Sequence, residues 1–558
     1  MNDQNTDQKK LRIGILCESR ELPAWTNYVI DTFASSQYAE LVLIVIANRQ
    51  NPKEGFLGRL WRGRRKLIYF LYDKLDRIVF RSRIDAFAKS PLDEAHENVE
   101  ELLVAPIESG YSDFFPDDSV SEIKSKEIDV LLRFGFRILR GPILSAARYG
   151  VWSCHHGDNR VNRGGPPGYW EVLQNWPVTG SILQMLSEQL DGGHILYRSW
   201  SRTDQYSISR NKNQYYWKTS EFILRSLRDI HKFGEKQFIE NTKLLNDDLT
   251  FYDRPLYRAP TNITATRLAV QKLWQFAKRG IEKSFFVDQW FLLYSFSEKP
   301  ATSMRQFRYL MPPKDRFWAD PFIMKRDDKF FVFFEEFITK NGKAHISVME
   351  LDENGIASDI VEILVRPYHL SFPYIFEWAD RLFMIPESAS NRSIELYECT
   401  KFPHEWTFVH YIMTDVDAVD TSIFEHDGKW WLFCGWGDNK GMSHDDELFV
   451  FHADNPLSQN WVAHTRNPVV SDVRNSRPAG RLMHMNDRLI RPSQNGSKTY
   501  GYGFNINHVT LLTETEFEES EIDAMTPDWD KSISRTHTYN FVSGLTIGDA
   551  MTRRRKFF

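Results

Sequence analysis

The 558-residue chain has few of the features that mark metal-binding or disulfide-rich proteins. It contains four cysteines, Cys17, Cys154, Cys399 and Cys434, and their spacing fits neither a zinc site nor a dense disulfide framework. Free cysteines are typical of a reducing compartment. The sequence therefore predicts no metal centre and no disulfide scaffold.

Long apolar runs are also absent. Residues 1–10 are polar and lack the apolar core of a signal peptide, and no stretch approaches the roughly 20 apolar residues of a transmembrane helix. The formal net charge of −5 argues against general electrostatic binding of nucleic acid. We expect a cytoplasmic protein without a nucleic-acid partner.

Aromatic residues, by contrast, are abundant at 14%, with 17 Trp and 40 Phe. Such side chains fill β-sheet cores and also stack on sugars, and core packing explains most of them. The length predicts roughly two to four domains.

The chain opens with a β-α-β pattern. Residues 11–17 form a short apolar run typical of a buried parallel strand, followed by a helix at about 23–35 and a strand at 39–47. This order predicts a Rossmann-like α/β domain. The basic, aromatic segment 61–72 reads as a helix that either packs on this domain or lies on a membrane surface.

A catalytic pair is suggested within residues 150–196. His155 ends an apolar strand and Asp191 lies in a Gly-flanked turn, so the two side chains could meet in one cleft. An imidazole and a carboxylate can support acyl transfer, by stabilising an oxyanion and accepting a proton. The alternative is that His155 is structural.

The order of motifs in this stretch resembles folate-dependent formyltransferases that act on methionyl-tRNA or amino sugars. The matching positions are His155 at the strand end, the loop residues Arg163, Gly164, Pro167 and Trp170, and the turn residues Asp191, Gly193 and Ile195. The chain departs from the family at Ser153, where the family has Asn.

This resemblance implies catalytic roles for His155, Asp191 and Ser153, with 10-formyltetrahydrofolate as donor. The residues implied to bind this cofactor are Arg133, Phe134, Gly135, Phe136, Ile138, Leu139 and Asp191. Arg163 and Trp170 are implied to contact the substrate. Because a serine hydroxyl reaches less far than an asparagine amide, Ser153 slows the reaction, changes the donor or marks an inactive site.

Helical periodicity follows at about 206–238 and 265–283, separated by a Pro-containing connection. We therefore expect a formyltransferase-like domain at 1–244, a helical linker at 245–285 and a second domain at 286–558.

The second domain has the pattern of a β-propeller. Short apolar strands are separated by turns such as Asn341-Gly342 and Asp427-Gly428, and similar units recur every 40 to 60 residues. We expect five inner strands, near 319–323, 371–376, 420–424, 477–480 and 536–540. The fold prediction is an α/β domain joined to an all-β five-bladed propeller.

This half resembles the N-terminal propeller of glucosamine inositolphosphorylceramide transferases and, more distantly, glycoside hydrolases of the arabinanase and invertase type. The motifs are Trp318-Ala319-Asp320-Pro321, Ile385-Pro386-Glu387-Ser388 and Arg477-Pro478-Ala479-Gly480. The candidate glycan-binding residues are Trp318, Asp320, Tyr374, Glu387, Asp420 and Arg477. Of these, Asp320, Glu387 and Asp420 are candidates for paired-carboxylate chemistry or ordinary turn residues, and Trp318 and Tyr374 for stacking.

Together these patterns predict a cytoplasmic transferase that N-formylates a nucleotide-linked amino sugar in the synthesis of a surface polysaccharide or glycoconjugate, with a propeller that binds the glycan. Two alternatives remain open. In the first, the propeller cleaves or transfers a glycosidic bond and the first domain is inert or repurposed. In the second, the whole chain binds glycans without catalysis. The sequence leaves open whether the protein forms a homo-oligomer.

Overall fold

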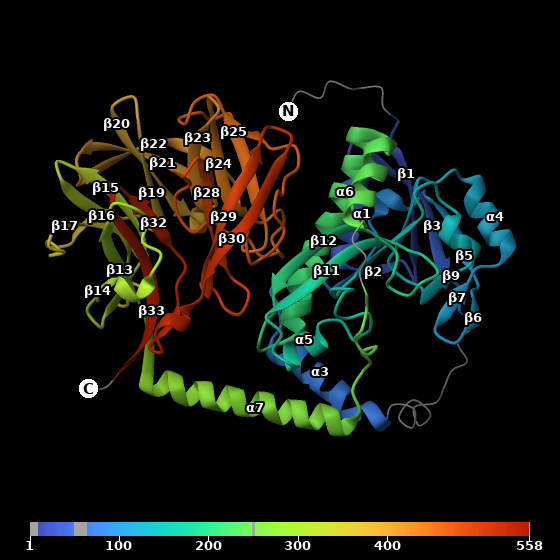
Figure 1. The fold of residues 1–558 in the computed structure, drawn as a ribbon. Helices are drawn as coiled ribbons and strands as arrows, with labels where there is room; N and C mark the ends of the chain where they lie inside the picture. Colours follow the sequence, from blue (N-terminus) through green and yellow to red (C-terminus); the bar gives the residue numbers. More distant parts are fainter. Residues whose placement is uncertain (1–8, 50–63, 248–250, 557–558) are drawn as a thin grey trace. The chain divides into compact units, whose positions relative to one another are not determined.

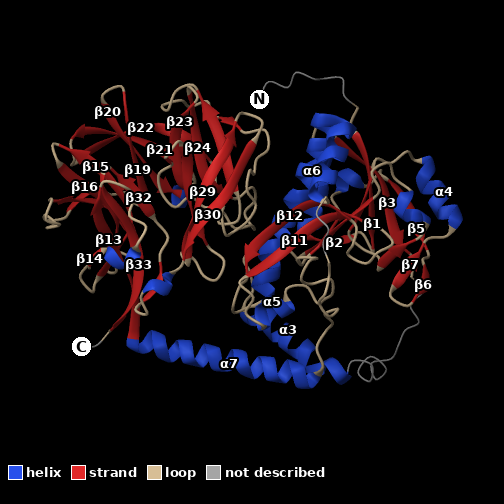
Figure 2. Ribbon diagram, viewed as in Figure 1, coloured by secondary structure: helices blue, strands red, loops and turns tan. Residues whose placement is uncertain are grey.

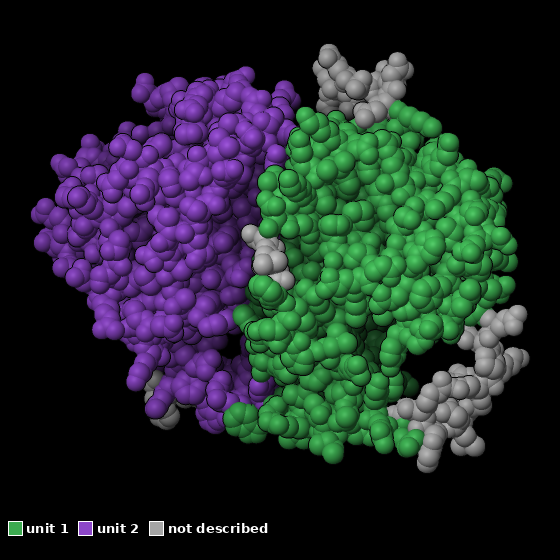
Figure 3. All heavy atoms as spheres, turned by 45° about the vertical axis from the view of Figure 1, so that its right-hand side comes forward, with its two compact units in different colours: residues 1–274, 439–442 green, residues 275–438, 443–558 purple. Residues whose placement is uncertain are grey.

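A computed structural model describes residues 9–49, 64–247 and 251–556 (Figure 1). The chain divides into two compact units. Unit 1 comprises residues 1–274 and 439–442, and unit 2 comprises residues 275–438 and 443–558 (Figure 3). The main division falls inside helix α7 (Asn262–Phe285). The boundaries at 244 and 285 stay a prediction.

Unit 1 is built on a seven-stranded mixed sheet. Its strand order is β12 (His194–Arg202), β11 (Val178–Met185), β10 (Val151–His155), β8 (Val130–Arg133), β1 (Leu11–Cys17), β3 (Ala39–Ala47) and β5 (Glu100–Val104). Strands β10, β8, β1, β3 and β5 run parallel, whereas β11 and β12 pair antiparallel. Strand β1 is buried almost throughout, as its continuous apolar run predicts.

Both faces of this sheet are covered. Helices α1 (Ala24–Ala34) and α6 (Ile208–Leu245) contribute Val29, Phe33 and Phe222 to the core on one side. Helix α4 (Asp117–Ser125) contributes Val120 and Ile123 to the core on the other. The predicted opening strand, helix and second strand are confirmed.

The remaining elements of unit 1 are short, apart from one amphipathic helix. They are β2 (Glu21–Pro23), α3 (Leu67–Val79), β4 (Lys89–Pro91), β6 (Ile107–Ser109), β7 (Ser112–Phe114), β9 (Ile138–Arg140) and α5 (Tyr169–Leu173). The helix predicted over 61–72 is present as α3 from residue 67, and its first predicted residues, 61–63, lie outside the described part of the chain.

Unit 2 consists almost entirely of strands (Figure 2). Its first sheet contains β14 (Arg308–Leu310), β13 (Phe286–Ser297), β33 (Gly544–Arg555), β31 (Ile533–Arg535) and β32 (Tyr539–Val542). Strand β13 pairs along its whole length with β33, from Phe286 opposite Arg555 to Ser297 opposite Gly544. The first and last strands of the unit thus close one sheet.

Four further antiparallel sheets follow in chain order. The first of these contains β15 (Arg316–Arg326), β16 (Lys329–Ile338), β17 (Ala344–Leu351) and β18 (Val361–Leu364), and the next contains β19 (Ser371–Trp378), β20 (Arg381–Ser388), β21 (Ser393–Lys401) and β22 (Glu405–Thr414). The third contains β23 (Ala418–His426), β24 (Lys429–Trp436), β25 (Leu448–Ala453) and β26 (Val462–Ala463). The fourth contains β27 (Met483–Met485), β28 (Arg488–Asn495), β29 (Gly503–Leu512) and β30 (Phe517–Met525). Sequential meanders with a closing strand pair give a propeller-like unit.

The first strands of three successive sheets share a bulge. In β15, β19 and β23 the pairing register shifts at equivalent points, and Asp320, Phe372 and Asp420 there have φ values of +50°, +42° and +53°. Positive φ is uncommon for residues other than glycine, and Asp tolerates it better than Phe. Such bulges re-aim side chains, and here they place two aspartates in one cluster.

One predicted inner strand is not a strand. Residues 477–480 make only an isolated bridge, Pro478 to Ser493, and Gly480 has φ +149°. A Cβ at Gly480 would lie 2.2 Å from the carbonyl oxygen of Tyr539, so close backbone approach requires glycine there. The proline and this close approach replace regular strand pairing.

Candidate functional site

The predicted pair in unit 1 forms at the carboxyl end of β10. His155 Nδ1 lies 3.5 Å from Asp191 Oδ1, and Gln184 Nε2 donates a hydrogen bond of 3.2 Å to the same oxygen. On its other side, His155 Nε2 lies 2.8 Å from the carbonyl oxygen of Asn162. Because a carbonyl only accepts, Nε2 is the donor there, and this nitrogen is not presented to a ligand.

Ser153 is held by a buried arginine. Arg133 Nη1 donates to Ser153 Oγ at 3.1 Å, and its Nη2 donates to the carbonyl oxygen of Phe136 at 2.8 Å. Burial lowers the pKa of Arg133. The serine oxygen therefore accepts from Arg133, and its hydroxyl donates to the carbonyl oxygen of Cys154 at 3.4 Å.

A cavity of about 290 Å³ adjoins this group. Four of the predicted cofactor-binding residues, Arg133, Phe134, Gly135 and Phe136, line it together with Ser153. Ile138, Leu139 and Asp191 do not line it, and Leu139 is 2% exposed in the core on the α4 side of the sheet. The predicted binding set is therefore too large, because alternate residues of a strand face opposite sides.

The predicted substrate residues of unit 1 are separated. Arg163 lines a different cavity of about 410 Å³, where its guanidinium lies 4.7 Å from the ring centre of Tyr252. Trp170 is half-buried against Tyr257, and its indole N–H donates to the carbonyl oxygen of Gly165. They do not form one site with His155.

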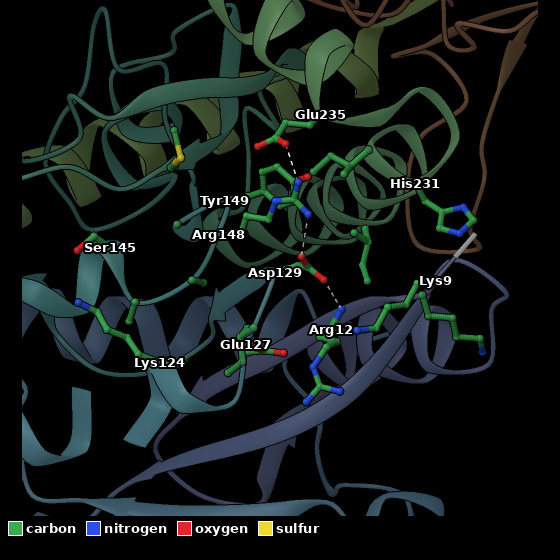
Figure 4. A pocket seen from close by; sticks show the side chains of 18 of the residues that line it. Lys9, Arg12, Lys124, Glu127, Asp129, Ser145, Arg148, Tyr149, His231 and Glu235 are labelled. Atoms are coloured by element: carbon green, nitrogen blue, oxygen red, sulfur yellow. Dashed lines mark hydrogen bonds and ion pairs between the residues drawn. The ribbon is translucent and has the colours of Figure 1, made fainter. Parts of the chain in front are cut away.

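A cavity of about 980 Å³ lies at the opposite edge of the sheet, near the amino ends of β1, β8 and β10 (Figure 4). Two of its acidic side chains pair with one arginine: Arg148 Nη2 lies 2.6 Å from Glu235 Oε2, and Arg148 Nη1 lies 3.9 Å from Asp129 Oδ1. None of the predicted site residues lines it. Ligands of parallel sheets bind at the carboxyl ends of the strands, so this cavity is not the candidate site.

The carboxylates of unit 2 gather around Arg477. Its Nε pairs with Asp420, its Nη1 lies 2.7 Å from Asp445 Oδ1, and its Nη2 lies 3.3 Å from Glu387 Oε2 and 3.2 Å from Asp420 Oδ1. Gln494 Nε2 also donates to Asp420, at 2.6 Å. Glu387 and Asp420 thus share one guanidinium nitrogen, and the fork geometry of arginine orients both.

Asp320 joins this cluster from another sheet. Thr538 Oγ1 donates to Asp320 Oδ1 at 2.8 Å, and the backbone N–H of Asp320 donates to Asp549 Oδ2 at 3.0 Å. His537 Nε2 lies 3.7 Å from Asp320 Oδ1, while its Nδ1 lies 2.7 Å from Asp549 Oδ2. Asp320 is 3% exposed. The bulge in β15 therefore buries a carboxylate among polar groups near β33, in the sheet that closes the unit.

Burial and like charge raise two carboxyl pKa values. Desolvation, with repulsion from Asp420 and Asp320, raises the pKa of Glu387 well above its usual range, although Arg477 opposes this. Desolvation also raises the pKa of Asp320 to about 7, against the lowering effect of His537. A carboxyl group that keeps its proton at neutral pH can act as an acid catalyst.

Two predicted stacking residues are core side chains instead. Trp318 is 7% exposed and its indole N–H donates to Glu336 Oε1 at 3.2 Å. Tyr374 is 2% exposed and its hydroxyl donates to the carbonyl oxygen of Ile423. Neither presents a ring face to a sugar. Tyr500, whose ring lies 5.1 Å from the Arg477 guanidinium, is an aromatic residue that does contact the cluster.

Three further residues of this network, Asp445, His537 and Asp549, were not among the predicted site residues. Ligand atoms of Asp320, His537 and Asp549 lie within 4.8 Å of one another, a spacing that could hold a metal ion. Nearby carboxylates raise the pKa of His537 to about 9, so the imidazole is protonated at neutral pH. His537 also links the two aspartates as an ion-paired network.

Buried carboxylates beside an arginine, in a propeller-like unit, form the candidate site of unit 2. A family described as "Glucosamine inositolphosphorylceramide transferase 1, N-terminal" matches residues 309–540, which include Asp320, Glu387, Asp420 and Arg477.

Individual relatives carry the same name. Glucosamine inositolphosphorylceramide transferase 1 of Oryza sativa subsp. japonica is 31% identical over 210 residues, covering 37% of this chain and 28% of the relative. The protein of that name from Arabidopsis thaliana is 27% identical over 209 residues, covering 37% and 27%. The chain thus matches little more than a quarter of the length of these relatives.

Solved structures show weaker similarity. Zg3597, a family 117 glycoside hydrolase of Zobellia galactanivorans, is 10% identical with a TM-score of 0.33, covering 47% of this chain and 91% of that one. The catalytic domain of a Coprinopsis cinerea GH62 α-L-arabinofuranosidase is 11% identical with a TM-score of 0.34, covering 47% and 97%.

These findings correct the functional prediction. The resemblance to the glucosamine inositolphosphorylceramide transferase propeller is supported, whereas N-formylation with a folate donor is contradicted, because the relatives are named as a different class of transferase. The residues that carried the formyltransferase resemblance lie before residue 309, outside the family match. His155 and Asp191 do meet, but proximity alone does not define a reaction.

Proposed function

We propose that the propeller-like unit acts on a glycosidic bond, by transfer or hydrolysis, with Glu387 as the acid. Cleaving such a bond needs one carboxyl group that protonates the leaving oxygen and a second that activates the incoming group. The cluster around Arg477 contains carboxyl groups of both kinds.

The observation that carries this proposal is the environment of Glu387. Its carboxyl group is mostly buried, with a side-chain exposure of 13%, and lies beside the shared Nη2 of Arg477. Repulsion from Asp420 and Asp320 favours its protonated form. Arg477 meanwhile keeps the group in place, so a proton is held at a fixed position.

Asp320 is the proposed base. With a pKa of about 7, it is substantially ionised just above neutral pH and can accept a proton from a sugar hydroxyl or water. In this step the glycosidic C–O bond breaks, Glu387 gives its proton to the leaving oxygen, and Asp320 accepts the proton of the attacking hydroxyl. A new C–O bond forms to the attacking oxygen.

The substrate class follows from the relatives. Their name supports glucosamine as the transferred sugar and inositolphosphorylceramide as the acceptor, and we propose that the glucosamine donor is nucleotide-linked or glycan-linked. The matched region is only 28% of the length of the rice relative. The activity of that whole protein is therefore a proposal for this chain. Formyl transfer from a folate donor has no part in this proposal.

Glycan binding without turnover is a second candidate. Asp420 and Asp549 are fully hydrogen-bonded within the protein, and Asp320 is 3% exposed. A network this saturated also fits a rigid binding surface. The two candidate functions differ in whether the carboxylates take part in breaking and forming a glycosidic bond.

Mass spectrometry of reactions with the full chain distinguishes them. The chain is incubated with nucleotide-activated amino sugars plus inositol phospholipid acceptors, and separately with aryl glycosides. We expect a transferred or released sugar that is lost with Glu387→Gln and kept with Glu425→Gln, a matched change at an exposed residue of β23. Binding of these ligands without any product favours the second candidate.

A further inference from the structure

Helix α3 presents its apolar side to solvent. Its exposed large side chains are Leu67 (51%), Phe70 (53%), Leu71 (52%), Leu75 (52%), Ile78 (65%) and Val79 (69%). At about 100° per residue these positions share one face of the helix. A contiguous apolar face on a surface helix marks an interaction site.

The opposite face of α3 is polar and points inward. Asp76 is 6% exposed, and its Oδ2 accepts hydrogen bonds from Ser207 Oγ at 3.0 Å and from the backbone N–H of Ser209 at 2.7 Å, at the start of α6. Tyr69 and Tyr72 pack on the same side, against the cluster that contains Tyr169. These contacts fix the rotation of α3 about its axis, so its leucines cannot turn inward.

Basic residues flank the apolar face. Residues 64–83 contain seven Arg or Lys and two Asp, although the whole chain carries a net charge of −5. Arg64, Arg65 and Lys66 directly precede the helix and are exposed, as are Arg81 and Arg83 after it. The two acidic residues, Asp73 and Asp76, are on the inward side. The outward side therefore combines apolar and positive character.

Helix α7 adds to this surface at its start. Asn262 Oδ1 accepts the backbone N–H of Ile68 at 3.0 Å, and its Nδ2 donates to the carbonyl oxygen of Arg64 at 2.6 Å. This one side chain ties the first turn of α7 to the first turn of α3. Ile263, next to it, is 86% exposed. The link holds the basic residues and the apolar helix together.

We propose that α3, with Arg64, Arg65 and Lys66, binds the surface of an anionic lipid bilayer. A helix with an apolar face and a cationic border lies in the interface between headgroups and acyl chains. Anionic headgroups attract the border, and the attraction weakens with salt. A protein groove would match the apolar face but would leave this cluster of positive charge without a counterpart.

The binding would be peripheral. Among the residues that the structure describes, no helix is long and apolar enough to cross a membrane. The sequence left open whether this helix packs on the domain or meets a membrane, and the inward aspartates and outward leucines allow both at once.

Vesicle sedimentation of the full chain tests this proposal. We expect sedimentation with phosphatidylcholine vesicles containing about one-third phosphatidylserine, and much less with phosphatidylcholine alone. Leu71→Glu and Leu75→Glu should each lower the bound fraction at least about fivefold, because each puts a charge at the apolar interface. Both residues are exposed, so the fold should be unaffected. Leu244→Glu, at a residue of α6 that is 72% exposed, is the matched control and should bind like wild type.

Two results would overturn the proposal. One is a wild-type chain that stays in the supernatant with anionic vesicles at low salt. The other is concentration-dependent dimerisation, seen by light scattering and abolished by Leu71→Glu, together with vesicle binding that Leu71→Glu leaves unchanged. The second outcome would make another copy of the chain the occupant of this face.

Discussion

His537 and Asp549 form a buried ion pair that joins the last strand of unit 2 to the carboxylate cluster. His537 Nδ1 lies 2.7 Å from Asp549 Oδ2, and the imidazole stacks on Trp290 with a centroid separation of 4.2 Å and an interplanar angle of 14°. Asp549 also accepts the backbone N–H groups of His537 and Thr538. Strands β13 and β33, which close the unit, supply Trp290 and Asp549.

This pair predicts a fall in stability at alkaline pH. The folded-state pKa of His537 is about 9, against 6.5 ordinarily, so its contribution is complete below about pH 6.5 and is lost as pH rises through 9. The raised pKa of Asp320 acts in the same direction as pH passes 7. The thermal midpoint should therefore decrease between pH 7 and 9, and His537→Gln should flatten that decrease. An unchanged slope in the variant would exclude His537 as its source.

Arg477 should be essential for the stability of unit 2. Arg477→Met leaves Asp420, Asp445 and Glu387 without their shared cation, and breaking a buried ion network of this kind costs about 3–5 kcal/mol. Urea unfolding measures the loss. Arg392→Met is the control, since Arg392 and its partner Asp415 are 45% and 89% exposed and such pairs contribute about 0–1 kcal/mol. Equal losses of unfolding free energy in the two variants would contradict the role of Arg477 as the shared cation of these carboxylates.

Asp76 should stabilise unit 1 through the start of α6. Asp76→Ala removes the acceptor for Ser207 and Ser209 and should cost about 1–2 kcal/mol, as for a lost helix cap. Thermal unfolding followed by circular dichroism measures this. Asp253→Ala, at a side chain that is 85% exposed, should change little. No difference between the two variants would mean that Asp76 does not anchor α3.

The pH dependence of turnover should report the two proposed catalytic groups. If Asp320 is the base, the rate rises as it ionises near pH 7, and it falls again at higher pH as Glu387 loses its proton. The expected profile of kcat/KM is bell-shaped, with an acidic limb near pH 7 that disappears with Asp320→Asn. A profile that stays flat between about pH 5 and pH 9 would exclude Asp320 as the base and Glu387 as the acid.

Local pattern predicted much of the fold. The apolar runs at 11–17 and 39–47 became β1 and β3, and the predicted strands near 371–376 and 420–424 lie within β19 and β23. Such runs succeed because burial on both faces leaves few other structures for them. The segment 477–480 failed because its geometry depends on the approach of Tyr539, a contact over long sequence separation.

The candidate site was predicted only in part, for a similar reason. Asp320, Glu387, Asp420 and Arg477 were found through motifs, but Asp549 and His537 lie more than 200 residues from Asp320 and no motif links them. The signal for Asp549 was a single acidic residue within the apolar strand β33. Trp318 and Tyr374 were misassigned because sequence does not show which side of a strand faces the core.

The most direct test compares wild type and Glu387→Gln for turnover and for affinity, using the donor and acceptor found by the substrate screen. Glutamine has nearly the same shape and can still accept from Arg477, but it has no proton to give. We predict a rate loss of at least about 100-fold, within the range typical of general acid catalysis, with the dissociation constant changed less than about threefold. Unchanged turnover in Glu387→Gln would contradict the proposed function.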